Sequence, residues 1–331
     1  MDGVSLSLTG FNQSLLFSRA LHYLGKQTLD KEKWELIVID DCSAEDWESL
    51  LEPYRESINI RYIRLEHSRG WRSCERGYNV AFKESKFDIL AVTNPHLILH
   101  PEALEFLYLV HHTDQAKELN GRLWASLRGY TVTREDMPHF EEVDWRSSLE
   151  NVKKLPRFQN PWTLLWTDRK KFYGSFLCCS FRKDRWFEDI AVTEYRGAIN
   201  KEPGFPETFS YGNIDPWFLG TRRRAGWVDI NFDIERVYFI HQDHYTHAEL
   251  AKRFNVRSLL DEDGQSQLTA AWWGREWKPL NPEGTWPAPP VPWESYIPGS
   301  KKLPKLREEY LHYYDRAWAK EHAPWLLEEL E

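Results

Sequence analysis

A chain of 331 residues with 41% hydrophobic content can bury the core of one large α/β domain with an extension, or of two domains. Its formal net charge of −8 argues against a general nucleic-acid binder, although it leaves room for a local basic groove. Aromatic residues make up 15% of the chain, and such a surplus either fills a core or stacks on flat ligands and sugar faces.

The cysteine pattern and the absence of long apolar runs bear on the compartment. The cysteines are Cys42, Cys74, Cys178 and Cys179, with no C-x-x-C spacing, which favours reduced thiols over a disulfide framework or a zinc knuckle. An apolar strand begins by Val4, leaving no room for a signal peptide, and no run of 18 apolar residues occurs. The sequence therefore predicts a soluble, cytoplasmic protein without a membrane span.

Strands and helices alternate through the first hundred residues. Short apolar runs predict strands over Val4–Leu8, Glu35–Ile39, Ile60–Leu65 and Phe87–Val92. Helices are expected from Asn12 to about Gly25, near Arg72–Glu84, and from Pro101. This alternation predicts an α/β fold whose mainly parallel central sheet is flanked by helices.

Polar clusters follow three of these strands, at Thr9–Asn12, Asp40–Ser43 and Thr93–His96. Ligands of parallel sheets collect at the carboxyl ends of the strands, so the three clusters predict one site. No G-x-G-x-x-G follows the first strand and no Walker sequence occurs, which disfavours a dehydrogenase or a P-loop nucleotidase.

The second half of the chain carries further strands and one well-delimited helix. Strands are expected over Trp124–Thr133, Ser175–Phe181 and Val237–Ile240. Asp215 is the predicted N-cap of a helix with Pro216 at its first position. Three arginines at the negative end and Gly226 as the C′ residue complete this helix.

After Leu268 tryptophans alternate with prolines up to Pro298, a composition too rich in proline for a regular sheet or helix. So many aromatics predict an ordered arm that wraps the preceding domain. From Pro304 an amphipathic helix is expected, whose apolar stripe packs on the core or on a second copy of the chain. The predicted domains are residues 1–268, with halves 1–100 and 101–268, and the Trp/Pro-rich arm and helix at 269–331.

Several stretches resemble the family-2 glycosyltransferases. Residues 4–12, Val-Ser-Leu-Ser-Leu-Thr-Gly-Phe-Asn, are similar to that family's opening Val-Ser-Val-Ile-x-Thr-x-Tyr-Asn. Residues 35–43, Glu-Leu-Ile-Val-Ile-Asp-Asp-Cys-Ser, are similar to its Glu-Ile-Ile-Val-Val-Asp-Asp-Gly-Ser. Gly204–Gly226 resembles its Gly-Phe-Asp-Glu-x-Phe…Tyr-Gly-x-Glu-Asp…Arg…Gly, with Ile214 in place of the usual Glu. The resemblance implies a Rossmann-like GT-A fold.

Carried over residue by residue, the resemblance implies a nucleotide-sugar site. Phe11 would stack on the base, Thr9 would line its pocket, and Asp41 would accept the N3–H of uracil or thymine. One of Asp40 and Asp41 is expected instead to cap the next helix from a turn. The diphosphate is assigned to Arg69, Arg72 and Arg76, although arginines of this kind are also common as plain surface charges.

The metal motif departs from the family, because Asn94-Pro95-His96 stands where Asp-x-Asp is usual. Mn²⁺ accepts imidazole as well as oxygen, so His96 is the first candidate ligand for Mn²⁺ or Mg²⁺, and Asn94 is assigned to the ribose or the metal. A histidine cluster further on offers His241 and His244 as ligands. The alternatives are an Asn-Pro turn with an incidental His, and a histidine-rich helix start.

The implied function is an inverting transfer of a sugar from a nucleotide sugar, UDP-linked, to a hydroxyl acceptor such as a glycan, with Asp215 as general base. Trp162, Trp166 and Trp217 are expected to border the acceptor cleft, although each also fits a core. Two alternatives stay open. One is a non-catalytic GT-A-like protein that binds carbohydrate or nucleotide, and the other is a viral transferase acting on a hydroxymethylated DNA base.

Overall fold

The computed structural model of the chain describes residues 1–10, 13–41, 43, 45–65, 74–132, 136–140, 142–155, 176–193, 202–205, 214–231 and 237–242. The strands are β1 (Val4–Gly10), β2 (Trp34–Asp40), β3 (Ile60–Arg64), β4 (Ile89–Thr93), β5 (Leu97–Leu99), β6 (Leu123–Ser126), β7 (Arg128–Val132), β8 (Cys179–Arg182), β9 (Val228–Asn231) and β10 (Tyr238–Gln242). The α-helices are α1 (Ser14–Leu24), α2 (Trp47–Leu51), α3 (Cys74–Glu84), α4 (Ala103–Val110), α5 (Asp114–Glu118), α6 (Met137–Phe140), α7 (Leu149–Val152), α8 (Lys183–Arg185) and α9 (Ile214–Arg224). Short 3-10 turns lie at Lys31–Lys33 and Glu52–Tyr54, and a π-helical turn at Trp186–Ile190 continues α8.

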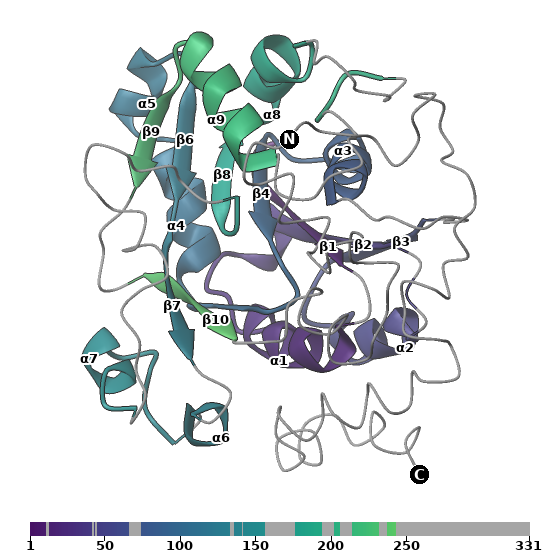
Figure 1. The fold of residues 1–331 in the computed structure, drawn as a ribbon, viewed down its shortest axis with the longest axis vertical. Helices are drawn as coiled ribbons and strands as arrows, with labels where there is room; N and C mark the ends of the chain where they lie inside the picture. Colours follow the sequence, from purple (N-terminus) through teal and green to yellow (C-terminus); the bar gives the residue numbers. More distant parts are fainter. Residues whose placement is uncertain are drawn as a thin grey trace, which may run out of the picture.

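Two sheets form the frame (Figure 1). The larger has the strand order β3-β2-β1-β4-β8-β6-β9, and the smaller has the order β5-β10-β7. Strands β3, β2, β1 and β4 are mutually parallel, whereas β8 runs antiparallel to both β4 and β6. The expected α/β class with a mainly parallel central sheet is confirmed, and the carboxyl ends of β1, β2 and β4 meet at one edge.

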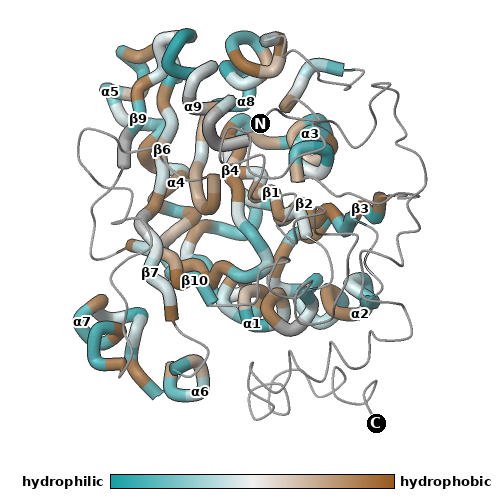
Figure 2. Tube along the Cα trace, in the orientation of Figure 1, coloured by the Kyte–Doolittle hydropathy of each residue, from teal (hydrophilic) through white to brown (hydrophobic). Residues whose placement is uncertain are grey.

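The larger sheet separates two hydrophobic cores. Leu36 and Val38 of β2 belong to a core shared with α1, α2 and α4. Ile37 and Ile39 point to the opposite face, into a core shared with α3 and α9. Burial on both faces explains why β2 is a continuous apolar run rather than an alternating one. Figure 2 shows the hydrophobic segments along the central strands, with a more hydrophilic α5 at the periphery.

A third core lies under the smaller sheet, where α6 and α7 pack. Trp145 stacks on Phe140 with ring centroids 5.2 Å apart and meets Tyr23 edge-on at 5.0 Å. The hydroxyl of Tyr238 donates a hydrogen bond to the carbonyl of Trp145. Trp145 therefore fills a core. Among the described residues no helix is both long enough and apolar enough to cross a membrane.

Arg222 ties α9 to β9. Its Nε and Nη2 donate to the two carboxylate oxygens of Asp229 at 2.8 and 3.1 Å. Its guanidinium lies 3.4 Å from the ring centroid of Trp124, and its side chain is only 1% exposed. One of the three arginines expected to neutralise the helix end is thus a buried ion-pair partner. Gly226 ends this segment with a φ of +77°, which confirms its prediction as the C′ residue.

We expect Asp229→Ala to lower the free energy of unfolding by about 3 kcal/mol, because a buried arginine loses its carboxylate. We choose the lower end of the range for breaking a buried ion pair, because the side chain of Asp229 is 19% exposed and the pair is therefore partly solvated. Denaturant titration measures the change. The matched control is Asp184→Ala, whose side chain is 47% exposed and pairs with Arg182 and Arg185, so its loss should cost less than about 1 kcal/mol. Equal losses in the two variants would contradict the prediction.

Candidate functional site

The carboxyl ends of three neighbouring strands bring Thr9, Asp41 and Asn94 to one edge of the larger sheet. Strand β1 lies between β2 and β4, and its register pairs Gly10 with Asp40. The N–H of Asp41 donates to the carbonyl of Gly10 at 3.0 Å, so Asp41 leaves β2 directly beside the end of β1. Thr9 and Asp41 are both buried. The structure thus assembles the three polar residues that the sequence predicted to meet.

Helix α3 covers the end of β1 by a close approach at Gly77. A Cβ atom added to Gly77 would lie 2.2 Å from Oγ1 of Thr9, so a larger residue here would displace the helix. Arg76, half-buried, precedes this glycine in α3. It is therefore the one of the three predicted diphosphate arginines that the structure describes, since Arg69 and Arg72 lie outside the described residues.

The two neighbouring aspartates have different environments. Asp40 is fully buried, and its Oδ1 accepts the N–H of Ser43 at 2.7 Å. Its Oδ2 accepts the Tyr62 hydroxyl at 2.8 Å and Nη1 of Arg64 at 3.1 Å. Burial, followed by the hydrogen bond to Asp40, raises the pKa of Tyr62 above its usual range, so this hydroxyl stays a donor. Asp40 therefore stabilises the turn, which leaves Asp41 as the ligand candidate.

Asn94 follows β4 and contacts α3. The hydroxyl of Tyr78 lies 3.2 Å from Oδ1 of Asn94 and 3.3 Å from the carbonyl of Thr93. The backbone carbonyl of Asn94 accepts the N–H of Leu97 at 3.0 Å. An amide oxygen has two lone pairs, so Asn94 can accept from Tyr78 and still contact a ligand.

His96 and His241 meet although they are far apart in the sequence. Strand β10 pairs with β5 so that His241 is opposite Leu97, and the N–H of Gln242 donates to the carbonyl of His96 at 3.0 Å. The two ring centroids are 4.9 Å apart with the planes at 68°. Two imidazoles in this arrangement fit as two ligands of one cation, with the remaining positions left to ligand oxygens. No cluster of three or more His, Cys, Asp or Glu suited to a metal occurs in the part of the chain that the structure describes.

Asp215 lies in the first turn of α9, and here the structure corrects the sequence prediction. The helix begins at Ile214, so Asp215 is its second residue rather than the N-cap, and Pro216 is the third. All three remain in the first turn, where the positive end of the helix favours an anion. Trp217, also in this turn, is half-buried with its ring centroid 5.7 Å from that of Phe205.

Other predicted site residues lie outside the described residues. These are Phe11, Trp162, Trp166 and His244. Their roles stay predictions.

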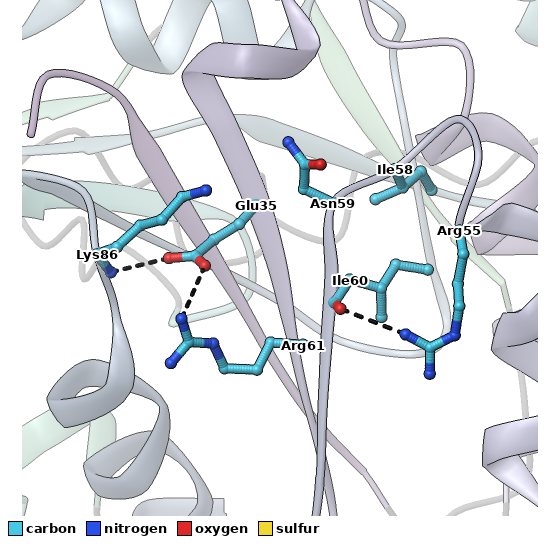
Figure 3. Close-up of a pocket in the computed structure, with 7 residues that line it drawn as sticks. All are labelled: Glu35, Arg55, Ile58, Asn59, Ile60, Arg61 and Lys86. Atoms are coloured by element: carbon cyan, nitrogen blue, oxygen red, sulfur yellow. Dashed lines mark hydrogen bonds and ion pairs between the residues drawn. The ribbon is translucent and has the colours of Figure 1, made fainter.

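An open cavity of about 330 Å³ lies at the opposite end of the sheet (Figure 3). It is lined by Glu35, Arg55, Ile58, Asn59, Ile60, Arg61 and Lys86. Glu35 and Arg61 come from the amino-terminal halves of β2 and β3, away from the edge that carries Asp41. The buried Glu35 carboxylate accepts the Ser5 hydroxyl at 2.7 Å and the N–H of Lys86 at 2.9 Å. This cavity is therefore separate from the candidate site.

Comparison with known proteins identifies the segment that carries the site. Residues 9–172, which include Thr9, Asp41, Asn94 and His96, match the profile described as glycosyl transferase family 2. We call these residues, which make up just under half of the chain, the family-2 segment. The family-2 segment begins within β1 and runs past α7, and the larger sheet that it helps to build is the mainly parallel α/β sheet expected from the sequence.

Individual relatives of the family-2 segment are distant. Poly(ribitol-phosphate) beta-N-acetylglucosaminyltransferase TarS of Staphylococcus aureus is 27% identical over 125 residues, which span 36% of this chain and 22% of TarS. The uncharacterized glycosyltransferase YfnE of Bacillus subtilis is 23% identical over 186 residues, 56% of this chain and 45% of YfnE. The chain thus matches less than half of either relative. A crystal structure of S. aureus TarS with UDP-GlcNAc has a TM-score of 0.48 at 12% identity, covering 94% of this chain and 80% of that one.

Proposed function

We propose that the chain is an inverting glycosyltransferase that moves a sugar from a UDP-linked donor to a hydroxyl acceptor. The observation that supports this most is the meeting of Thr9, Asp41 and Asn94 at the carboxyl edge of a family-2 sheet. In open α/β sheets that edge is where ligands bind. The carboxylate of Asp40 is hydrogen-bonded within its own turn and to Tyr62, which supports Asp41 as the residue that contacts the base.

The donor is held by its base and its diphosphate. Asp41 accepts the N3–H of uracil, a donor that cytosine lacks, while Thr9 lines the same pocket and Phe11 stacks on the ring. Arg76, with Arg69 and Arg72, neutralises the diphosphate, and Asn94 contacts the ribose or the metal.

Asp215 is the general base of the transfer. Its carboxylate takes the proton of the acceptor hydroxyl while the oxygen attacks the anomeric carbon opposite the leaving group. The bond from that carbon to the diphosphate oxygen breaks, and UDP departs with the electron pair. One displacement with one base inverts the anomeric centre. The first turn of α9 favours the ionised carboxylate, so its main contribution is to orient the hydroxyl and to take the proton late.

His96 and His241 are the residues that would hold a divalent cation. Their ring separation of 4.9 Å fits two ligands of one ion, and the donor diphosphate would complete the coordination. When bound, such a cation neutralises the charge that develops on the leaving diphosphate.

The relative TarS suggests which substrates to test first. Its name states transfer of N-acetylglucosamine to poly(ribitol-phosphate), so UDP-GlcNAc is the first donor and a ribitol-phosphate polymer is one acceptor for this chain. Glycans and other hydroxyl acceptors are the comparison arms. Release of UDP that depends on one acceptor class would identify the acceptor.

Thermal unfolding with UDP tests the donor site. UDP at a hundredfold excess over its dissociation constant is expected to stabilise the chain by about 2.7 kcal/mol. Asp41→Ala should remove most of this stabilisation because the base loses its acceptor. Glu48→Ala, an exposed carboxylate on the nearby α2, is the matched control and should keep the full shift. Melting curves that no nucleotide moves would overturn the proposed function.

A further inference from the structure

Arg64, the last residue of β3, bridges the two ends of the turn that carries Asp41. Its Nη1 donates to Oδ2 of Asp40 at 3.1 Å, and its Nη2 donates to the carbonyl of Ser43 at 2.7 Å. A guanidinium presents these donors from one rigid plane, so a single side chain sets the distance between the start and the end of the turn. Asp41 lies between the two points that Arg64 holds.

The backbone around Asp41 is held from both neighbouring strands as well. The carbonyl of Asp40 accepts the N–H of Leu65 at 2.8 Å, and the N–H of Asp41 donates to the carbonyl of Gly10 at 3.0 Å. Backbone hydrogen bonds from the ends of β3 and β1 thus hold the chain at the point where β2 ends. Asp40 is fully buried whereas the side chain of Arg64 is 48% exposed, so Arg64 reaches the carboxylate from the solvent side.

Tyr62 supplies a further donor to Asp40 from inside the same strand. Its hydroxyl lies 2.8 Å from Oδ2, the same oxygen that Arg64 contacts. Tyr62 and Arg64 are two residues apart in β3, so both side chains project to the same face of the strand. Asp40, Tyr62, Arg64 and Ser43 therefore form one hydrogen-bond network around the turn that carries Asp41, which we call the turn clamp.

We propose that Arg64 and Tyr62 are positioning residues for nucleotide selection, which act through Asp40 by holding Asp41 in the direction of the base N3–H. This inference rests on the proposed function of Asp41. A carboxylate held in one direction accepts a hydrogen bond from the N3–H of uracil and repels the N3 lone pair of cytosine. The turn clamp would therefore make the site bind uracil nucleotides more tightly than cytosine nucleotides. Loosening the clamp should reduce this preference while the diphosphate contacts persist.

Titration calorimetry with UDP and CDP tests the inference. Arg64→Met is expected to weaken UDP binding about tenfold, within the range for a hydrogen bond to a charged group, and to change CDP binding by less than about twofold. Tyr62→Phe removes one donor at nearly constant volume and should shift the UDP-to-CDP ratio in the same direction by a smaller factor. Arg64→Lys should restore part of the preference, because a lysine reaches Asp40 without bridging to Ser43.

Arg61→Met is the matched control. Arg61 lies in the same strand with a similar side-chain exposure, 40%, but pairs with Glu84 at 3.2 Å near the opposite end of β3. It should leave both nucleotide affinities unchanged. If Arg64→Met weakened UDP and CDP binding equally, Arg64 would be assigned to the shared ribose or diphosphate and the inference would be overturned. The inference would also be overturned if Arg64→Met, like Arg61→Met, left both affinities unchanged.

A double-mutant cycle separates this inference from the proposed function. If the clamp acts through Asp41, Arg64→Met should cost no further UDP affinity in an Asp41→Ala background. Full additivity of the two losses would overturn the positioning role while leaving Asp41 in place. An Asp41→Ala variant with wild-type UDP affinity would instead contradict the proposed function itself. All variants are compared below their melting temperatures, so that a loss of folding is not read as a loss of binding.

Discussion

Asp215→Asn is expected to lower kcat about 10²–10⁴-fold, the usual contribution of a general base, with the dissociation constant of UDP unchanged. The amide keeps the size of the side chain but cannot take the proton of the acceptor. Folding should survive because α9 begins at Ile214, so the helix start does not depend on residue 215 as its N-cap. Single-turnover transfer and UDP calorimetry on the same preparation measure the two quantities.

Asp184→Asn is the control for this variant, since it removes an exposed carboxylate in α8 that forms ion pairs with the neighbouring Arg182 and Arg185. It should retain the wild-type kcat. An Asp215→Asn enzyme with near wild-type kcat would exclude Asp215 as the base. The next carboxylates to replace would then be Glu207, in the Gly204–Gly226 stretch, and Asp243, which precedes His244 in the sequence.

His96→Ala is expected to weaken Mn²⁺ binding to the UDP complex by at least about tenfold to a hundredfold. Losses of that size already follow when a residue that only hydrogen-bonds to a metal ligand is replaced. The reason is the approach of His96 and His241 to 4.9 Å between ring centroids, which suits two ligands of one ion. Spin-resonance detection of free Mn²⁺ during a titration measures the affinity without relying on turnover. His241→Ala should give a loss of the same order.

His139→Ala is the control, because the side chain of His139 in α6 is exposed and pairs with Glu142. It should leave Mn²⁺ affinity unchanged. Wild-type transfer that proceeds at full rate with EDTA would contradict the metal proposal. Neutralisation of the diphosphate would then be assigned to arginines, of which Arg76 is the first to replace.

The local pattern of the sequence was sufficient for the first half of the sheet. The apolar run at Glu35–Ile39 predicted a strand of a mainly parallel sheet, and the structure places alternate residues of this strand in two cores. The polar residues after β1, β2 and β4 predicted one shared edge, because parallel strands with right-handed crossovers end on the same side. Gly226 was predictable for the same kind of reason, since a positive φ strongly favours glycine.

The arrangement of the strands in the second half of the chain depended on tertiary contacts that the local sequence pattern does not encode. Trp124–Thr133 was expected as one strand, but the chain forms β6 in the larger sheet and β7 in the smaller one. The two strands are separated at Leu127, whose N–H donates to the carbonyl of Cys178. Both segments contain residues that favour strands, so only their partners in space decide which sheet each joins. The antiparallel direction of β8 was equally invisible in its sequence.

The sequence by itself therefore determined the fold class, the edge at which the candidate site lies and the residue types there. Only the tertiary structure decided which of those residues stabilise the fold and which are left to contact a ligand. Asp40 and Asp41 are identical in type and adjacent, and it is Tyr62 and Arg64 from β3 that commit Asp40 to the turn. Likewise His96 meets His241 only because β10 pairs with β5. Propensity and periodicity act between near neighbours in the chain, whereas the environment of a charge or an imidazole is set by whichever strand packs beside it.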